Sequence, residues 1–230
     1  MTPPTSLGAG VRSARGAVDD GLIGAPVAAA AFITASGLEH PYPASELNHR
    51  PGAGSLLDLG PVCLRALVHL LGPVSRVTGA TSGPRAERTA DGAPGAEEGF
   101  ETEPDTQVTG VLEHTDGPLT TLVIRSGSRT AGLPRIEVHG TEGSLSLPGL
   151  DGGDGPVALH RADGEWEPLP ETALAEDLVD RPHRADQPHR APDELARHAL
   201  DVMLTLFDAA RDGVWLPVRG DRARPEAVRT

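Results

Sequence analysis

Residues 52–73 have the sequence GAGSLLDLGPVCLRALVHLLGP, and this stretch contains the clearest helical pattern of the chain. Its second half has apolar residues at the i, i+3, i+4, i+7 spacing of a helix that buries one face. Pro61 suits the first turn of such a helix, because a first-turn residue does not need the backbone N–H that proline lacks. Gly72-Pro73 ends the helix. The apolar positions are Leu64, Leu67, Val68 and Leu71.

Asp58, in the glycine-rich turn before this helix, has two possible roles. It could cap the helix by accepting hydrogen bonds from free backbone N–H groups, which stabilises a helix by about 1 kcal/mol. The glycines at 52, 54 and 60 favour a residue that lines a site, because glycine allows close approach at an entropic cost that a cap does not require. A catalytic carboxylate needs a partner that takes or gives the proton. One helical turn further on lies Val62, which can do neither, and the chemistry leaves both roles open.

The composition limits the possible domain count, core residues, mechanisms and partners of this protein. The chain has 230 residues, enough for one large domain or two small ones. With 38% apolar but only 3% aromatic residues, its core must consist mainly of Leu, Val and Ala. All twenty basic residues are arginine, which excludes every mechanism based on lysine. The net charge of −13 argues against nucleic acid as a partner, because that affinity comes from basic side chains on phosphates.

Cysteine content and the N-terminus narrow the class further. Cys63 is the single cysteine and lies in an apolar run, so we expect an inert core thiol, no internal disulfide and no multi-cysteine metal site. The N-terminus lacks a basic region followed by an apolar run, and no stretch approaches the length of a membrane span. These features predict a soluble, cytoplasmic protein.

The remaining periodic segments predict an α+β fold. Two β-hairpins are indicated, one around Thr115-Asp-Gly-Pro118 and one around Gly140-Thr-Glu-Gly143. Strands do not alternate regularly with helices, so we expect an open, mostly antiparallel sheet with helices packed on one face. The helices are expected over 6–20 and 193–212. The strands are expected over 26–34, 75–82, 106–114, 119–126, 135–139, 144–147 and 157–160.

We expect a single domain over residues 1–230, within which three segments lack periodicity. Residues 36–51 predict a loop, 83–104 a flexible surface insertion and 177–192 a polar, proline-rich loop. The last loop contains His183 and His189 in a near-repeat, Arg-Pro-His-Arg-Ala and Gln-Pro-His-Arg-Ala. Because this loop has no regular spacing to hold ligands in place, a solvated loop is favoured over a ligand-facing loop, and a metal site is disfavoured.

The segment Gly8-Ala-Gly-Val-Arg-Ser13 nearly matches the dinucleotide-binding fingerprint G-x-G-x-x-G. That fingerprint requires a strand before the turn and a helix after it. Residues 1–7 are too few and too proline-rich to form the strand, and the third glycine is replaced by Ser13. We therefore reject dinucleotide binding by this segment.

Taken in order, several segments resemble the Gfo/Idh/MocA oxidoreductases, the family of glucose–fructose oxidoreductase and inositol dehydrogenase. Such proteins have an N-terminal Rossmann domain that holds NAD or NADP and a C-terminal domain with an open sheet, which shapes the substrate pocket and usually mediates oligomerisation. All matching segments correspond to the second domain. They are Leu7–Arg15, Asp19–Val27, Arg50–Gly60, Leu70–Val77, Ile136–Leu145, Pro188–Ala191 and Glu194–Met203.

The resemblance implies roles for individual residues. The family has an Asp-x-x-x-His pair after the glycine turn, in which the histidine relays a proton to or from the substrate hydroxyl. Asp58 occupies the aspartate position, and Val62 stands where the histidine, or in some branches a tyrosine, would be. The catalytic lysine of the nucleotide domain has no counterpart. The resemblance also implies Arg50, and His183 or His189, as residues that line the substrate pocket.

From this resemblance we expect the substrate-binding and oligomerisation part of an oxidoreductase acting on a sugar-like or polyol hydroxyl. NAD or NADP is implied for the family, with no cofactor bound by this chain alone and no dehydrogenase activity in isolation. The chain is then truncated or split, with a homo-oligomer formed through the sheet and a separate Rossmann-domain chain as expected partners. The alternative is a non-catalytic binding or scaffolding module that pairs with a homologue or a nucleotide domain. Membrane and nucleic-acid partners are not expected.

Overall fold

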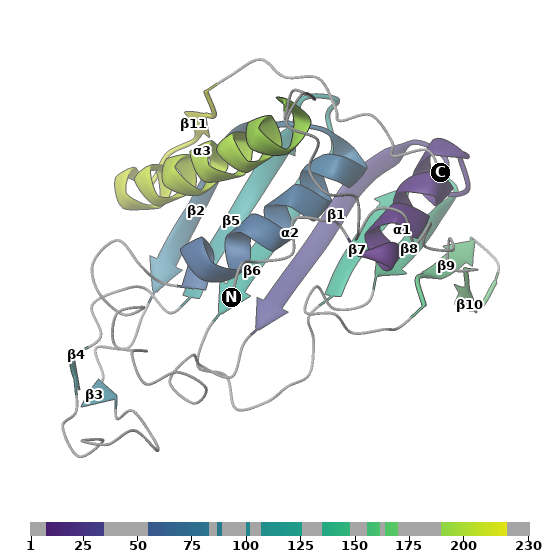
Figure 1. The fold of residues 1–230 in the computed structure, drawn as a ribbon, viewed down its shortest axis with the longest axis horizontal. Coiled ribbons are helices and arrows are strands. Elements are labelled where there is room, and N and C mark those ends of the chain that lie inside the picture. The colour runs from purple at the N-terminus through teal and green to yellow at the C-terminus, as the bar shows by residue number, and fades with distance from the viewer. Residues whose placement is uncertain are drawn as a thin grey trace, which may run out of the picture.

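The fold is a large sheet with three helices on one of its faces, as seen in a computed structural model of the chain (Figure 1). The structure describes residues 8–34, 55–82, 87–88, 100–101, 107–125, 135–147, 156–161, 164–169 and 190–219. The helices are α1 (Ala9–Asp19), α2 (Ser55–Leu71) and α3 (Arg190–Asp212). The longer strands are β1 (Pro26–Thr34), β2 (Val74–Ser82), β5 (Gln107–His114), β6 (Leu119–Arg125), β7 (Arg135–Gly140), β8 (Gly143–Leu147) and β9 (Ala158–Arg161). The two-residue strands are β3 (Glu87–Arg88), β4 (Phe100–Glu101), β10 (Glu167–Pro168) and β11 (Leu216–Pro217).

The large sheet has nine strands in the order β10-β9-β8-β7-β1-β6-β5-β2-β11, and β3 pairs with β4 separately. Neighbouring strands are antiparallel except at the centre, where β1 runs parallel to β6. Ala28 is paired there with Leu119 on one side and with His139 on the other. The predicted α+β class and both hairpins are confirmed, whereas nothing in the sequence indicated the central place of β1.

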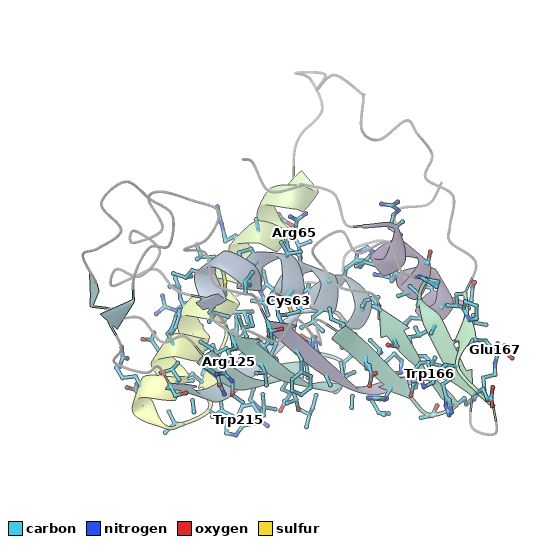
Figure 2. All side chains as sticks on the ribbon, turned by 90° about the horizontal axis from the view of Figure 1, so that it is seen from below. Cys63, Arg65, Arg125, Trp166, Glu167 and Trp215 are labelled. Atoms are coloured by element: carbon cyan, nitrogen blue, oxygen red, sulfur yellow. The ribbon has the colours of Figure 1, made fainter. Side chains whose placement is uncertain are left out.

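Alternation along the strands separates two faces of the sheet. In β5 the residues from Gln107 to His114 alternate between half-buried and buried, and β6 repeats this pattern. The buried set, together with the inner faces of the helices, forms one hydrophobic core of mainly aliphatic side chains. The opposite side of the sheet carries none of the helices described, and Figure 2 shows it along the lower edge. We call this side the open face.

Helix α3 packs over β2 and β5 at a pair of glycines. Gly79 and Gly110 face each other across these strands, and a Cβ on either one would lie within 3.0 Å of Leu206 Cδ1. Leu206 is fully buried. The missing glycine side chains therefore make the space that this leucine fills, and they bring α3 close to the sheet.

The connection from α1 to β1 packs on the turn between β7 and β8. Glu142 N donates to Ile23 O at 2.9 Å, and Thr141 N donates to Ala25 O at 3.0 Å. Gly24 has φ +68°, a conformation that glycine adopts readily. A Cβ on Gly24 would also collide with the Thr141 hydroxyl. This contact joins the N-terminal segment to the far half of the sheet.

Most predicted elements are found close to their expected bounds, but two helices begin earlier than predicted. Helix α2 begins at Ser55, six residues before Pro61, so this proline lies inside the helix. Helix α3 begins at Arg190, within the expected polar loop. Residues 36–51, most of 83–104 and residues 177–189 lie outside the described residues, and the proposed insertion and loop stay predictions.

Candidate functional site

The candidate site is the N-terminal half of α2, where the sequence places Asp58. This residue is the fourth of the helix rather than its cap, because α2 begins at Ser55. The capping role considered from the sequence is therefore wrong, and the site-lining role stays a prediction. Arg50, His183 and His189 lie outside the described residues, so the structure does not bring them to Asp58.

The helical repeat gives α2 an outer side in this region. Positions 58, 62 and 65 are separated by four and three residues, so they follow one another along one side of the helix. Val62 and Arg65 are both half-buried. Arg65 projects from α2 on the side away from the sheet (Figure 2). We call positions 58, 62 and 65 the outer stripe of α2.

The opposite side of α2 is held against α3 by a close helix contact. A Cβ on Gly60 would lie 2.7 Å from Met203 Sδ and 3.1 Å from Leu56 Cδ1. A larger residue at position 60 would force the side chain of Met203, or α3 itself, to shift. Gly60 is thus explained by helix packing, and it needs no ligand to account for it. In the sequence analysis Gly60 favoured a ligand site, but in the structure it allows α2 and α3 to pack closely.

Helix α1 holds the C-terminal half of α2. Arg15 is buried, and its Nη1 donates a hydrogen bond of 2.6 Å to the backbone oxygen of His69. Its Nε donates to Asp19 Oδ2 at 2.7 Å, within an i, i+4 ion pair. The carbonyls of the last turn of a helix lack partners inside the helix, and Arg15 satisfies one of them. Arg15 thereby ties the last turn of α2 to α1.

Two buried histidines lie under the Gly72-Pro73 turn that follows α2. His114 Nδ1 donates to Gly72 O at 2.7 Å, and its Nε2 accepts from the Thr120 hydroxyl at 2.9 Å. His198 Nε2 accepts from the backbone N–H of Val74 at 3.0 Å. Burial lowers the pKa of His114 to about 4; the Gly72 hydrogen bond opposes this shift, and the nearby His198 adds to it. His114 is therefore a neutral part of the framework at pH 7, and His198 fixes the start of β2 through its hydrogen bond.

Cys63 has no place in the site. It is fully buried on the inner side of α2, and burial raises the pKa of its thiol to about 12. The thiol is then protonated at neutral pH and is not a nucleophile. This confirms the inert core thiol that the apolar context predicts.

The two described residues of the outer stripe, Val62 and Arg65, carry no group that exchanges a proton at neutral pH. Val62 carries no ionisable group. Burial lowers the pKa of Arg65 below its ordinary value, yet a guanidinium stays charged in proteins and has only donors to offer. The sequence analysis did not select Arg65, although its spacing of seven residues from Asp58, two helical turns, was the signal that could have found it.

The described ranges contain neither a metal-binding cluster nor a membrane-spanning helix. No group of three or more His, Cys, Asp or Glu side chains there could hold a metal ion. No helix among the described residues has the length and apolar character needed to cross a membrane.

Solved structures with a similar fold include oxidoreductases that bind NAD or NADH. An NAD binding oxidoreductase from Klebsiella pneumoniae is 20% identical with a TM-score of 0.69, over 90% of this chain and 63% of that one. Levoglucosan dehydrogenase in complex with NADH and L-sorbose is 16% identical with a TM-score of 0.66, over 92% and 64%. The WlbA dehydrogenase from Bordetella pertussis, in complex with NADH and UDP-GlcNAcA, is 18% identical with a TM-score of 0.67, over 92% and 61%.

A family profile described as the GFO/IDH/MocA C-terminal domain matches residues 11–146, more than half of the chain. The chain therefore belongs to the Gfo/Idh/MocA family and contains its C-terminal domain. It spans less than two thirds of the length of the solved structures named above. No curated protein matches the chain in sequence.

The glycines of the rejected fingerprint lie at the start of a helix of this domain. Gly8 precedes α1, whereas Gly10 and Ser13 are inside it. A phosphate-binding turn needs its glycines between a strand and a helix. These glycines begin a helix that packs against α2 and β8.

Proposed function

We propose that this chain is the substrate-binding and oligomerisation part of an NAD(P)-dependent oxidoreductase that acts on a sugar-like or polyol hydroxyl. In this proposal the nucleotide is held by a Rossmann domain in another part of the enzyme or in another chain, and residues 1–230 alone transfer no hydride. A cytoplasmic location belongs to the same prediction. The observation that carries the proposal is the family match over residues 11–146, with Val62 at the position of the proton carrier.

The outer stripe of α2 is the part that meets the substrate in this proposal. Asp58 accepts hydrogen bonds from a hydroxyl or from a neighbouring donor, and Arg65 donates to an oxygen two turns along the same helix. Val62 between them supplies apolar contact. Arg50, and His183 or His189, remain predicted pocket residues. Levoglucosan dehydrogenase with L-sorbose and WlbA with UDP-GlcNAcA support the substrate class, because both are similar folds with sugar ligands.

The first prediction concerns the cofactor. Purified chain titrated with NADH should give no saturable change in nucleotide fluorescence, because the family match assigns residues 11–146 to the C-terminal domain and the proposal places the nucleotide in a Rossmann domain elsewhere. A dissociation constant in the micromolar range would contradict the proposal. The Val62→His variant is the matched comparison, because it restores the proton carrier without adding a nucleotide site. It should also fail to bind NADH.

The oligomerisation part of the proposal rests on the open face. Phe32 in β1 and Leu119 in β6 are 42% and 45% exposed there. Charged residues lie around these positions on the neighbouring strands, with Arg125 at the end of β6, Glu137 on β7, Glu113 on β5 and Arg76 on β2. An apolar centre with a polar rim is the usual anatomy of a protein interface. The proposed occupant is a second copy of this chain.

The size of the open face fits such a partner. The seven strands from β9 to β2 are spaced about 4.8 Å apart and use about six residues each, which gives roughly 30 Å by 20 Å. The resulting area of about 600 Å² per partner is at the lower end of stable interfaces. A dimer through the whole face is therefore large enough to persist in solution.

The second prediction concerns this dimer. Phe32→Glu should convert the dimer into a monomer in sedimentation velocity near pH 8, because it places a charge in the apolar centre. Leu204→Glu is the matched control. Leu204 is 50% exposed on α3, on the other side of the sheet, so its variant should remain dimeric. Equal effects of both substitutions, or a monomeric wild type, would contradict the sheet-face interface.

A second candidate function, a non-catalytic scaffold, is favoured by Val62. A module that only pairs with a homologue or with a nucleotide domain has no use for a proton carrier. The two hypotheses predict different DNA sequences upstream of the Met1 codon. An in-frame Rossmann-coding segment supports the enzyme, an adjacent separate gene supports a two-chain assembly, and the absence of both supports the scaffold.

A further inference from the structure

The two edges of the large sheet are formed by short segments with the same local sequence pattern. At one edge Trp166-Glu-Pro168 contains β10, and at the other edge Trp215-Leu-Pro217 contains β11. Figure 1 shows these two strands at opposite ends of the sheet, and among the described residues no strand lies beyond either of them. The chain has two tryptophans, and each begins one of these segments. We call the two segments the edge motifs.

The edge motif of β10 turns the backbone nitrogen of its proline away from the sheet. Pro168 lies opposite Ala158 of β9 in an antiparallel pair. The next residue, Leu169, donates its backbone N–H to Val157 O at 2.7 Å. Because successive residues of an antiparallel strand direct their backbone groups to alternate sides, the nitrogen of Pro168 points outward.

The edge motif of β11 repeats this arrangement on the other side of the molecule. Pro217 lies opposite Arg76 of β2, again in an antiparallel pair. The next residue, Val218, donates its backbone N–H to Ser75 O at 2.8 Å. The nitrogen of Pro217 therefore also points outward. At both edges, the residue that faces away from the sheet is the one type that has no backbone N–H.

This placement makes both edges poor templates for another strand. A strand that joins a sheet exchanges N–H···O=C hydrogen bonds with the outward groups of the edge strand. Proline offers its carbonyl but no donor, and its ring carbon occupies the space of the missing hydrogen. The edge strands β10 and β11 are also only two residues long, which further limits pairing.

The two edges differ in how much they depend on the proline. Around β11 the run Val-Trp-Leu-Pro-Val over 214–218 has no charged residue, and Val214 and Trp215 are 46% and 42% exposed. Without its proline this run has the composition of segments that pair with copies of themselves. Around β10 the exposed Glu165 and Glu167 add like charges, which oppose the approach of a second copy.

We propose that the edge motifs keep a second copy of this chain from adding its edge strand to the sheet, because Pro168 and Pro217 withhold the outward N–H that such pairing needs. Pro217 has the larger effect, since no charge protects its edge motif. If β11 could accept a strand, two copies would pair β11 with β11 about a two-fold axis. This inference concerns the sheet edges and does not depend on the proposed sheet-face dimer.

The test is sedimentation velocity of the full chain, with far-UV circular dichroism of each variant to show that the fold is retained. Pro217→Thr restores the outward N–H and adds a polar side chain that favours strands. We expect it to increase the mass of the wild-type particle at least about twofold. Pro217→Glu is the matched control, because it restores the same N–H but places like charges between the two copies. It should keep the size of the wild-type particle.

Pro168→Thr tests the other edge. At low ionic strength we expect this variant to keep the wild-type size, because Glu165 and Glu167 of two copies repel each other. At about 1 M salt, which screens charges beyond about 3 Å, it should form larger particles than the wild type at the same salt. The wild type measured at both salt concentrations is the control for effects of salt on other contacts.

The outcomes decide the proposal at each edge. A folded Pro217→Thr variant of wild-type size overturns it, and so does a Pro217→Glu variant that associates as strongly as Pro217→Thr. If Pro217→Thr does not fold, Pro168→Thr decides, and wild-type size at both salt concentrations overturns the proposal. A monomeric wild type with a dimeric Pro217→Thr variant supports the edge motifs while it contradicts the sheet-face dimer, so the two proposals can fail separately.

Discussion

Replacement of Leu206 by alanine is expected to lower the free energy of unfolding by about 4 kcal/mol. Leu206 is fully buried and lies over Gly79 and Gly110, which have no side chains to move into the vacated space. The cost of a leucine-to-alanine change rises with the cavity that remains, because the lost contacts add to the lost burial. Strand backbones under a helix move little, so this cavity should stay open.

Urea unfolding followed by circular dichroism measures the effect, and Leu204→Ala is the matched control. Leu204 is two residues away on the same helix but 50% exposed. Its replacement should change the free energy of unfolding by less than about 0.5 kcal/mol. If the two variants lose the same stability, α3 does not pack on the glycine pair as described.

Acidification is expected to destabilise the protein through His114. Its pKa is lowered from 6.5 to about 4 in the folded protein, mainly by burial. The unfolded chain therefore binds a proton more readily than the folded one below about pH 6.5, and stability falls with falling pH. This contribution is complete above pH 6.5, declines by about 2 kcal/mol at pH 5 and by about 3 kcal/mol near pH 4.

The variant His114→Asn isolates this contribution from the other titrating groups. Its side-chain amide can still donate to Gly72 O, but it does not titrate. Although the variant should be less stable than the wild type at pH 7.5, the gap should narrow by about 2 kcal/mol at pH 5. A gap that stays constant between these pH values would show that His114 does not lose its neutral form on unfolding.

The candidate site stays a prediction from the glycine-rich turn and the family resemblance, which both single out Asp58. The structure adds only that position 58 lies within α2, one and two helical turns before Val62 and Arg65. The helix start was predicted too late, because Pro61 suggested a first turn whereas the helix accommodates it at its seventh position. Arg65 was missed because an arginine within an amphipathic helix has no local signal beyond its spacing.

The sequence by itself determined which segments form helices and strands, where the hairpins turn, and that the thiol of Cys63 is inert. These properties depend on residues close together in the chain, whose periodicity and turn chemistry act locally. Only the tertiary structure decided that β1 lies between β6 and β7, that Gly79 faces Gly110 under Leu206, and that the two edge motifs lie at opposite edges of one sheet. Those arrangements depend on which segments bury their apolar sides against one another. Segments far apart in the chain can pair in many ways, and the energy that selects one pairing exists only once the layers have packed.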